Sequence, residues 1–400
     1  MVLALGAALA ANVPGLVEVE WFGWHVAFHP VWLVVALALF WCVTHIARRA
    51  WNWLRWKSGL FGPARTLRRQ RAALGNASAA LAALVFGQEE RAATLAGDAL
   101  KSDPTNVMAR AVAAMTGDEA RIEQLDQDRA TKPLAALARL RTSPGVSAAE
   151  QATLVAPASP VAWRAVVEES ARAGDFAGAL TALPKWRALD DEAERLGSWI
   201  EAALRTGAAD AELDEEPARA ELARALKAEP RFAPAATRLA LFAEEAPDVS
   251  AAERAAESVW SVQPTPQLGR AYAELYPLET DSDRLARLQR LAEQNPKHPD
   301  SLLLVGEAAL MAGDPSLALD SVVPLLETPP VRLRAAAIAL EAYRRLGMEP
   351  AMGAAWLDAA ATGAPGLRWQ CTNCRTQTVD WVLECPNCRH VGLMLPETAI

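Results

Sequence analysis

The sequence predicts an all-α protein, and three features of its 400 residues support that fold class. Hydrophobic residues, mostly Ala and Leu, make up 52% of the chain and aromatic residues only 6%, which is typical of closely packed small-residue helices. A long uncharged segment lies near the amino end, and proline-closed Ala/Leu-rich segments recur through the middle. Only five cysteines occur, four of them within the last thirty residues, so a disulfide-stapled secreted scaffold is excluded.

Residues 1–47 are expected to be a membrane anchor, because Val31–Ala47 carries no charge. Seventeen residues at ~1.5 Å each reach about 25 Å, which spans a ~30 Å hydrocarbon core if flanking side chains anchor the ends. The alternative is a buried helix of a soluble core. The flanking residues predicted at the two membrane–water interfaces are Trp32, Trp41, Arg48, Arg49, Trp51 and Trp53.

An earlier apolar stretch, Val2–Val17, is broken by Asn12 and by Pro14-Gly15. About twelve apolar residues before the break are few for a complete span. A signal peptide is disfavoured because no positively charged region precedes the stretch. The stretch therefore predicts a truncated first helix, which would make the anchor a helical hairpin.

Residues 48–75 are predicted to form a basic juxtamembrane helix. Eight Lys and Arg residues lie between Arg48 and Arg71 without an intervening acid. The positive-inside rule then places everything after the span in the cytoplasm. A nucleic-acid patch is the other interpretation, but the position beside a span favours attraction to anionic lipid. The rest of the chain is acidic, which argues against a nucleic-acid partner.

Residues 76–365 are predicted to be a helical repeat. Prolines close Ala/Leu-rich segments at positions 230, 264, 296, 330 and 365, in steps of 34, 32, 34 and 35 residues. This period and helix-pair content resemble the tetratricopeptide family. Its pattern can be placed on Gly87, Ala92, Ala99-Leu100 and Pro104, on Trp163, Gly174-Asp175-Phe176 and Ala179, and on Val305-Gly306, Gly313-Asp314, Ala318, Pro330 and Gly347. Residues 115–155 and 200–220 depart from the pattern.

A helix pair of this kind cannot bury its apolar face alone, so consecutive pairs are expected to stack into a solenoid. The Ala and Leu positions are then core. The resemblance implies a concave surface, lined by the first helix of each pair, where partner proteins lie. The predicted groove residues are Arg164, Glu168, Arg172, Glu307, Arg334, Glu341 and Arg345, although each also fits a solvated surface charge.

Residues 366–400 contain the strongest chemical motif, C-x2-C-x10-C-x2-C, formed by Cys371, Cys374, Cys385 and Cys388. Each two-residue spacer lets a tight turn place both thiolates on one edge of a tetrahedron. Four Cys ligands close the coordination sphere, so the motif predicts a structural Zn²⁺ site rather than a catalytic one. Rubredoxin-type iron uses similar knuckles and stays an alternative, whereas a redox dithiol is disfavoured by the paired knuckles.

The whole arrangement resembles the HemY-type membrane proteins of proteobacteria, through the stretch WFGWHVAFHPVWLVV and the basic run GPARTLRRQRAALG. The tail is similar to that of LapB, a single-span tetratricopeptide protein with a rubredoxin-like end, through WQCTNC and ECPNCR. The shortened first apolar stretch departs from the two-span HemY pattern, and only the cysteine motif is specific at the level of residues.

The HemY resemblance implies a non-enzymatic scaffold of the bacterial inner membrane, with cytoplasmic carboxyl-terminal domains and haem-synthesis enzymes as protein partners. The LapB resemblance implies instead an adaptor that regulates lipopolysaccharide synthesis through a membrane protease. An enzyme is disfavoured because no G-x-G-x-x-G after a strand, P-loop, G-x-S-x-G or H-E-x-x-H motif occurs.

Overall fold

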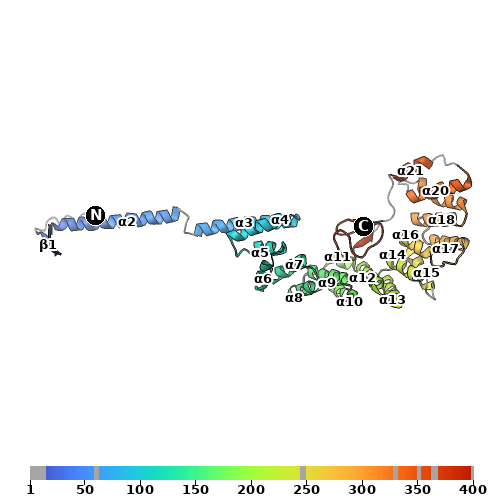
Figure 1. The fold of residues 1–400 in the computed structure, drawn as a ribbon, viewed down its shortest axis with the longest axis horizontal. Coiled ribbons are helices and arrows are strands. Elements are labelled where there is room, and N and C mark those ends of the chain that lie inside the picture. The colour runs from blue at the N-terminus through green and yellow to red at the C-terminus, as the bar shows by residue number, and fades with distance from the viewer. Residues whose placement is uncertain are drawn as a thin grey trace. The chain divides into compact units, whose positions relative to one another are not determined.

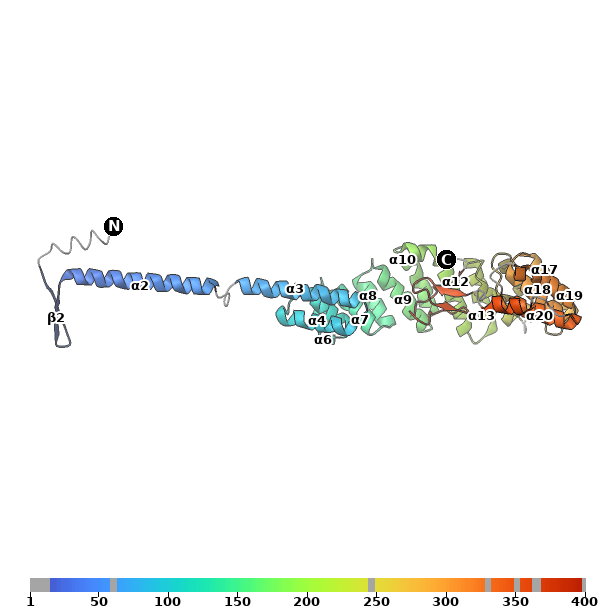
Figure 2. The same ribbon diagram turned by 90° about the horizontal axis from the view of Figure 1, so that it is seen from above.

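A computed structural model of the protein describes residues 15–57, 63–243, 249–327, 332–348, 353–361 and 368–397 (Figure 1; Figure 2). The chain divides into two compact units, residues 1–131 and residues 132–400. Both units are built mainly from helices, which confirms the predicted all-α class. Five short strands were not predicted: two precede the apolar helix and three lie in the cysteine-rich tail.

The amino-terminal unit begins with an antiparallel β-hairpin and continues as helices. Its elements are β1 (Val17–Trp21), β2 (Trp24–Phe28), α2 (Pro30–Lys57), α3 (Pro63–Val85), α4 (Glu89–Ser102), α5 (Val107–Met115) and α6 (Glu119–Asp126). Most of the predicted first helix, residues 2–14, lies outside the described residues. Its last residue, Val17, begins β1 rather than ending a helix.

Helix α2 is long and apolar enough to cross a membrane. The apolar stretch Val31–Leu54 has 24 residues, and none of its most apolar window is buried. At ~1.5 Å per residue, 24 residues reach about 36 Å, more than the ~30 Å hydrocarbon core. The helix continues without a break past Arg48 and Arg49, and α3 continues past residue 75. The boundaries predicted at residues 47/48, 75/76 and 365/366 therefore do not coincide with helix ends where helices are described, and they remain predictions.

The carboxyl-terminal unit stacks helix pairs and ends in a small sheet. Its helices are α7 (Lys132–Thr142), α8 (Val146–Val155), α9 (Pro160–Arg172), α10 (Phe176–Arg187), α11 (Asp191–Arg195), α12 (Gly197–Ala211), α13 (Glu215–Ala228), α14 (Ala233–Phe242), α15 (Ser250–Trp260), α16 (Pro266–Ala273), α17 (Asp281–Glu293), α18 (Pro299–Met311), α19 (Pro315–Glu327), α20 (Leu333–Leu346) and α21 (Gly353–Ala361). The strands β3 (Trp369–Cys371), β4 (Gln377–Thr378) and β5 (Met394–Pro396) form an antiparallel sheet in the order β4-β3-β5.

A shared turn separates the two helices of several pairs. Gly174 and Gly313 have φ angles of 80° and 81°, which side-chain-bearing residues rarely adopt. The amide of each glycine bonds to the carbonyl three residues earlier, and the amide of the following aspartate bonds to the carbonyl five residues earlier. Asp175 and Asp314 then cap the second helices by accepting hydrogen bonds from the amides of Gly178 and Leu317. The turn therefore ends one helix and starts the next.

The same turn occurs at Gly117-Asp118, inside the stretch that departs from the sequence pattern. Gly117 has a φ of 100°, and the Asp118 carboxylate accepts a hydrogen bond from the amide of Arg121. Helices α5, α6, α12 and α13 also occupy the stretches that the pattern did not cover. The helix pairs therefore continue where the side-chain signature is lost.

The first helices of successive pairs, α12, α14, α16, α18 and α20, contact one another in turn. Helices α14, α16, α18 and α20 begin at residues 233, 266, 299 and 333, so the structural repeat is 33 or 34 residues long. The predicted small positions Ala92, Ala99, Ala179 and Ala318 are fully buried, which confirms that they are core. At Gly306 an added Cβ would lie 2.9 Å from Val322, so α18 and α19 approach as closely as glycine allows.

We predict opposite effects for two glycine-to-alanine changes in the amino-terminal unit. Gly87→Ala places a side chain at a φ of 72° between α3 and α4 and should lower the free energy of unfolding by about 1 kcal/mol. Gly97→Ala lies inside α4 with open space around the new Cβ and should raise it by about 0.5–1 kcal/mol. Thermal melts followed by circular dichroism measure both. Shifts in the same direction would contradict this account of the turn.

Candidate metal centre

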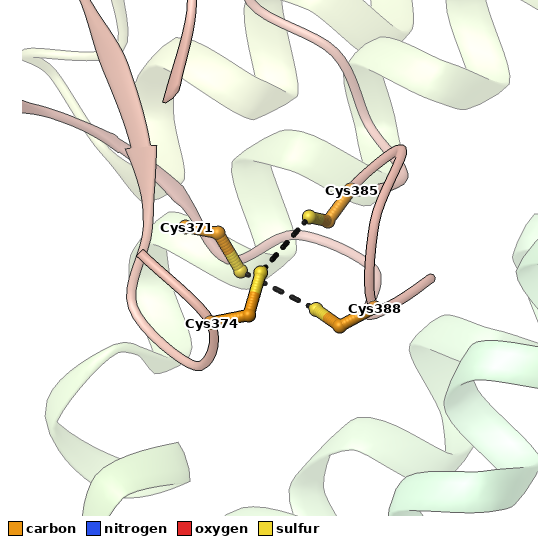
Figure 3. Close-up of side chains that lie close together, drawn as sticks. All are labelled: Cys371, Cys374, Cys385 and Cys388. Carbon is orange, nitrogen blue, oxygen red and sulfur yellow. Dashed lines mark hydrogen bonds between the residues drawn. The ribbon is translucent and has the colours of Figure 1, made fainter. Parts of the chain in front are cut away.

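The four predicted cysteine ligands converge at one point of the tail (Figure 3). All four Sγ atoms lie within 4.8 Å of one another, and the Cys371–Cys388 and Cys374–Cys385 pairs are 3.6 Å and 3.5 Å apart. A tetrahedron with metal–sulfur bonds of ~2.3 Å has edges of about 3.8 Å. The donor set and its spacing therefore fit a four-coordinate metal ion. The geometry suits Zn²⁺ and Fe equally, because both bind four thiolates in this way.

Two matching knuckles position the thiolates. In the first, the amide of Cys371 bonds to the carbonyl of Thr376, and the amide of Arg375 bonds back to the carbonyl of Cys371. In the second, Cys385, His390 and Arg389 make the same two bonds. Both arginines have a φ near 60°, so each knuckle closes through a left-handed residue directly after its second cysteine. The C-x2-C-R sequence thus folds the same way twice.

The protein places the four thiols in different electrostatic environments. Burial raises the pKa of Cys371 to about 12. Hydrogen bonding to Thr376 lowers the pKa of Cys374 to about 5. Burial also raises the pKa of Cys388. A metal ion binds thiolates rather than thiols, so its binding would release the protons that burial retains on Cys371 and Cys388.

The cysteine-rich tail, residues 368–397, is hereafter called the ribbon, and it packs against the first helices of the carboxyl-terminal unit (Figure 1). Trp369 and Met394 of the ribbon are buried in the same apolar cluster as Trp199 and Ile200 of α12. The indole N–H of Trp199 donates to the carbonyl of Met394 at 3.2 Å. The ribbon and the helix pairs therefore share one hydrophobic core.

Two glycines permit this close approach. A Cβ on Gly207 of α12 would lie 2.6 Å from a methyl carbon of Leu383 in the ribbon. A Cβ on Gly392 of the ribbon would lie 3.3 Å from Ile200, and Gly392 also has a φ of 72°. Sequence reasoning missed both residues. Neither belongs to the repeat pattern or to the cysteine motif, so only the pairing of the two parts gives them a role.

Charged groups complete the contact between the ribbon and α9. Glu168 Oε1 lies 2.8 Å from Nδ1 of His390. Arg172 donates to the carbonyl of Arg389 at 2.7 Å, and its Nε lies 3.4 Å from Glu384. Glu168 and Arg172 were predicted to line an open groove for partner proteins. The structure instead brings them against the ribbon.

Glu168 is a buried carboxylate with two cationic neighbours. Burial acts to raise its pKa, but the hydrogen bond from His390 and the charge of Arg164 outweigh burial and hold the pKa below its ordinary value. Arg164 donates to Glu168 at 2.9 Å, and its guanidinium also lies over the ring of Trp186. The ion pairs compensate the desolvation of the carboxylate, which would otherwise weaken the contact.

The other predicted groove residues form a separate, more exposed group on α18 and α20. Arg334 makes a two-pronged ion pair with Glu307, with shortest N–O distances of 2.7 Å. Arg345 pairs with Glu341 at 2.8 Å. These four charges contact one another rather than the ribbon. Their role in partner binding remains a prediction.

The predicted interface residues lie along α2. Trp32, Trp41, Trp51 and Trp53 are exposed, as are Arg48 and Arg49. Trp51 and Trp53 fall inside the apolar stretch Val31–Leu54, because the stretch extends beyond the predicted end at Ala47. The structure contains no bilayer that would place these side chains at an interface, so that assignment remains a prediction.

Comparisons with known proteins place the amino-terminal region. Residues 15–120 match the family model described as HemY protein N-terminus. Residues 15–120 are a HemY-type amino-terminal region. The chain is also 29% identical over 141 residues to the probable magnetosome protein Mms48 of Magnetospirillum gryphiswaldense, a match that covers 35% of this chain and 31% of that relative.

Solved structures with tetratricopeptide repeats are also similar. The TPR domain of P58(IPK) is 15% identical, with 72% of this chain and 92% of that chain covered and a TM-score of 0.21. A thermophilic TPR protein of Thermus thermophilus is 19% identical, with 60% and 100% covered and a TM-score of 0.18. The chain thus combines a HemY-type amino-terminal region, tetratricopeptide-like helix pairs and a four-cysteine tail, as predicted.

We predict that Cys371→Ser abolishes metal binding and destabilises the helix pairs as well as the ribbon. The serine removes one thiolate, and the ribbon core is continuous with that of α12, so several kcal/mol of metal-derived stability should be lost from both. Metal analysis and hydrogen exchange of α9 and α12 measure the two effects. Cys42→Ser, in the apolar span, is the control and should change neither. Faster exchange confined to the ribbon would contradict the shared core.

We predict that Arg172→Ala loosens the ribbon without changing the metal content. The change removes the contacts to Arg389 and Glu384 and should cost about 1–3 kcal/mol of docking free energy. Ribbon amides should then exchange faster, as measured by mass spectrometry. Arg187→Ala is the matched control, because Arg187 pairs with Glu194 and not with the ribbon. Equal acceleration in both variants would show that Arg172 does not hold the ribbon.

Proposed function

We propose that this protein is a scaffold of the bacterial inner membrane that binds haem-synthesis enzymes in the cytoplasm. The HemY-type match over residues 15–120 is the observation that carries the proposal. The apolar helix α2 and the helix pairs that follow it make the chain a membrane-anchored helical-repeat protein. The haem association rests on the family of the amino-terminal region.

The proposed orientation rests on charge. Arg48 and Arg49 lie in the carboxyl-terminal half of α2, and no acid occurs before Arg71. The hairpin on the other side of the span carries Glu18 and Glu20 instead. This asymmetry favours a cytoplasmic location for everything after α2. Basic residues on that side would also attract anionic lipid headgroups.

The proposed partner surface is the exposed face of α18 and α20. Glu307 and Arg334 are each about two-fifths exposed, and they join two successive first helices. An extended segment of a partner protein lies on such a face in helical-repeat proteins. The face carries both charge signs, so it suits a peptide with alternating charges better than a polyanion.

We propose that the metal centre holds Zn²⁺ in a structural role. Four thiolates leave no open position for a catalytic water. Cys371 and Cys385 are fully buried, which favours a site that stabilises the fold over one that reacts with substrate. Rubredoxin-type iron is the alternative, and a colourless protein with stoichiometric zinc would exclude it.

A LapB-like adaptor that regulates lipopolysaccharide synthesis through a membrane protease is the second candidate. The observation that favours it is the four-cysteine ribbon seated on tetratricopeptide-like helices, because LapB combines the same two parts. The two candidates share an architecture and differ in their partners, so partner identity separates them.

The experiment is in-cell cross-linking of the tagged full-length protein, followed by solubilisation of the membrane and mass spectrometry of the attached proteins. We predict that haem-synthesis enzymes are recovered and that Arg334→Glu reduces their yield several-fold, because the change reverses a charge on the α18–α20 face. Arg187→Glu on the second helix α10 is the control and should leave the yield unchanged.

Either of two results would contradict this proposal. Recovery of a membrane protease together with a lipid A-modifying enzyme would establish the second candidate. Equal yields from the wild type and Arg334→Glu, with partners attached, would show that the α18–α20 face is not the binding surface.

A further inference from the structure

The β1–β2 hairpin, which precedes the span, has one apolar and one polar face. Its antiparallel register pairs Val19 with Val26 and Glu20 with His25. Because side chains alternate along a strand, Val19, Trp24 and Val26 share a face, and Glu20 and His25 lie on the other. The polar face carries an ion pair, with Glu20 Oε1 2.7 Å from Nδ1 of His25.

The apolar face is unusually exposed for residues of its type. Trp24 is 76% exposed, and Val19 and Val26 are each about half exposed. Together with Phe22 and Phe28 they surround a hollow of about 450 Å³. An isolated two-stranded hairpin is only marginally stable in water, because it has no core. Something outside the described residues therefore covers this face when the hairpin is stable.

The position of the hairpin identifies the cover. Only His29 separates β2 from α2, and the apolar stretch of α2 begins at Val31. The hairpin is thus tethered beside one end of the membrane-spanning helix. Trp and Phe side chains prefer the membrane–water interface, where one part of the residue is apolar and the other is hydrated.

The dimensions and the backbone decide how the hairpin lies. Five residues per strand at ~3.4 Å each give a length of about 17 Å, whereas one headgroup layer is only about 7 Å thick. The two outer edges of a two-stranded sheet carry unpaired N–H and C=O groups, which are too costly to place in hydrocarbon. A flat position at the surface keeps these edges hydrated and still buries the apolar face.

We propose that the β1–β2 hairpin is a second membrane contact that lies flat on the lipid surface at the start of α2. Trp24, Val19 and Val26 enter the boundary of the acyl chains, and the Glu20–His25 pair faces water. The hairpin then fixes the depth and rotation of α2, because it cannot leave the surface while the span is inserted. This inference rests on the proposed membrane anchor.

The test uses a photoreactive benzophenone amino acid at single positions of the full-length protein in phosphatidylethanolamine/phosphatidylglycerol vesicles with alkyne-tagged acyl chains. Trp24 and His25 form a matched pair, adjacent in sequence and on opposite faces. Val26 and Ala27 form a second pair, which keeps the test valid if one substitution disturbs the hairpin. We expect lipid adducts several-fold more abundant at positions 24 and 26 than at positions 25 and 27.

Leu37, in the middle of the apolar helix, separates failure of the hairpin proposal from failure of the anchor. Lipid adducts at position 37, but equal yields from both faces of the hairpin, would overturn the surface contact alone. Position 24 adducts to a second copy, to another protein or to residues 1–14 of the same chain would also overturn it. Absence of lipid adducts at position 37 would overturn both proposals.

Discussion

The contact between the ribbon and α12 is the interaction on which the middle of the carboxyl-terminal unit depends. A ribbon of about thirty residues is too small to bury a core of its own, and small domains usually need a metal ion or a partner surface. Here it has both, because the buried Cys371 and Cys385 belong to the same apolar cluster as Trp199 and Phe232. Metal binding and packing of the repeats are therefore energetically coupled rather than independent.

Local features of the fold could be predicted from the sequence because local chemistry determines them. Gly313-Asp314 marks a helix–helix turn, since only glycine readily adopts a positive φ and aspartate caps the next helix. The C-x2-C spacing determines the knuckle geometry in the same way, and all four metal-ligand candidates converge as predicted. The Gly117-Asp118 turn carries an equally clear signal, which the irregular spacing around it obscured.

Contacts between distant parts of the chain could not be predicted in this way. Glu168 and His390 are 222 positions apart, and neither residue type indicates the other as its partner. The apolar run Gly392–Pro396 was a usable signal, because a solvated tail has no need for it. The β1–β2 hairpin was missed for a different reason: its apolar alternation is short and lies next to a longer apolar helix that dominated the interpretation.

The position of the ribbon narrows the surface that a partner protein can use. The ribbon occupies the first-helix side from α9, through Arg172, to α16, where Gln267 donates to Asp380 at 2.9 Å. A partner that binds this stretch must displace a shared hydrophobic core, whereas one that binds α18 and α20 only competes with exposed ion pairs. Exposed ion pairs are worth about 1 kcal/mol or less, far below the cost of opening a core. The α18–α20 face is consequently the more accessible part of the first-helix surface, and the ribbon sets its boundary.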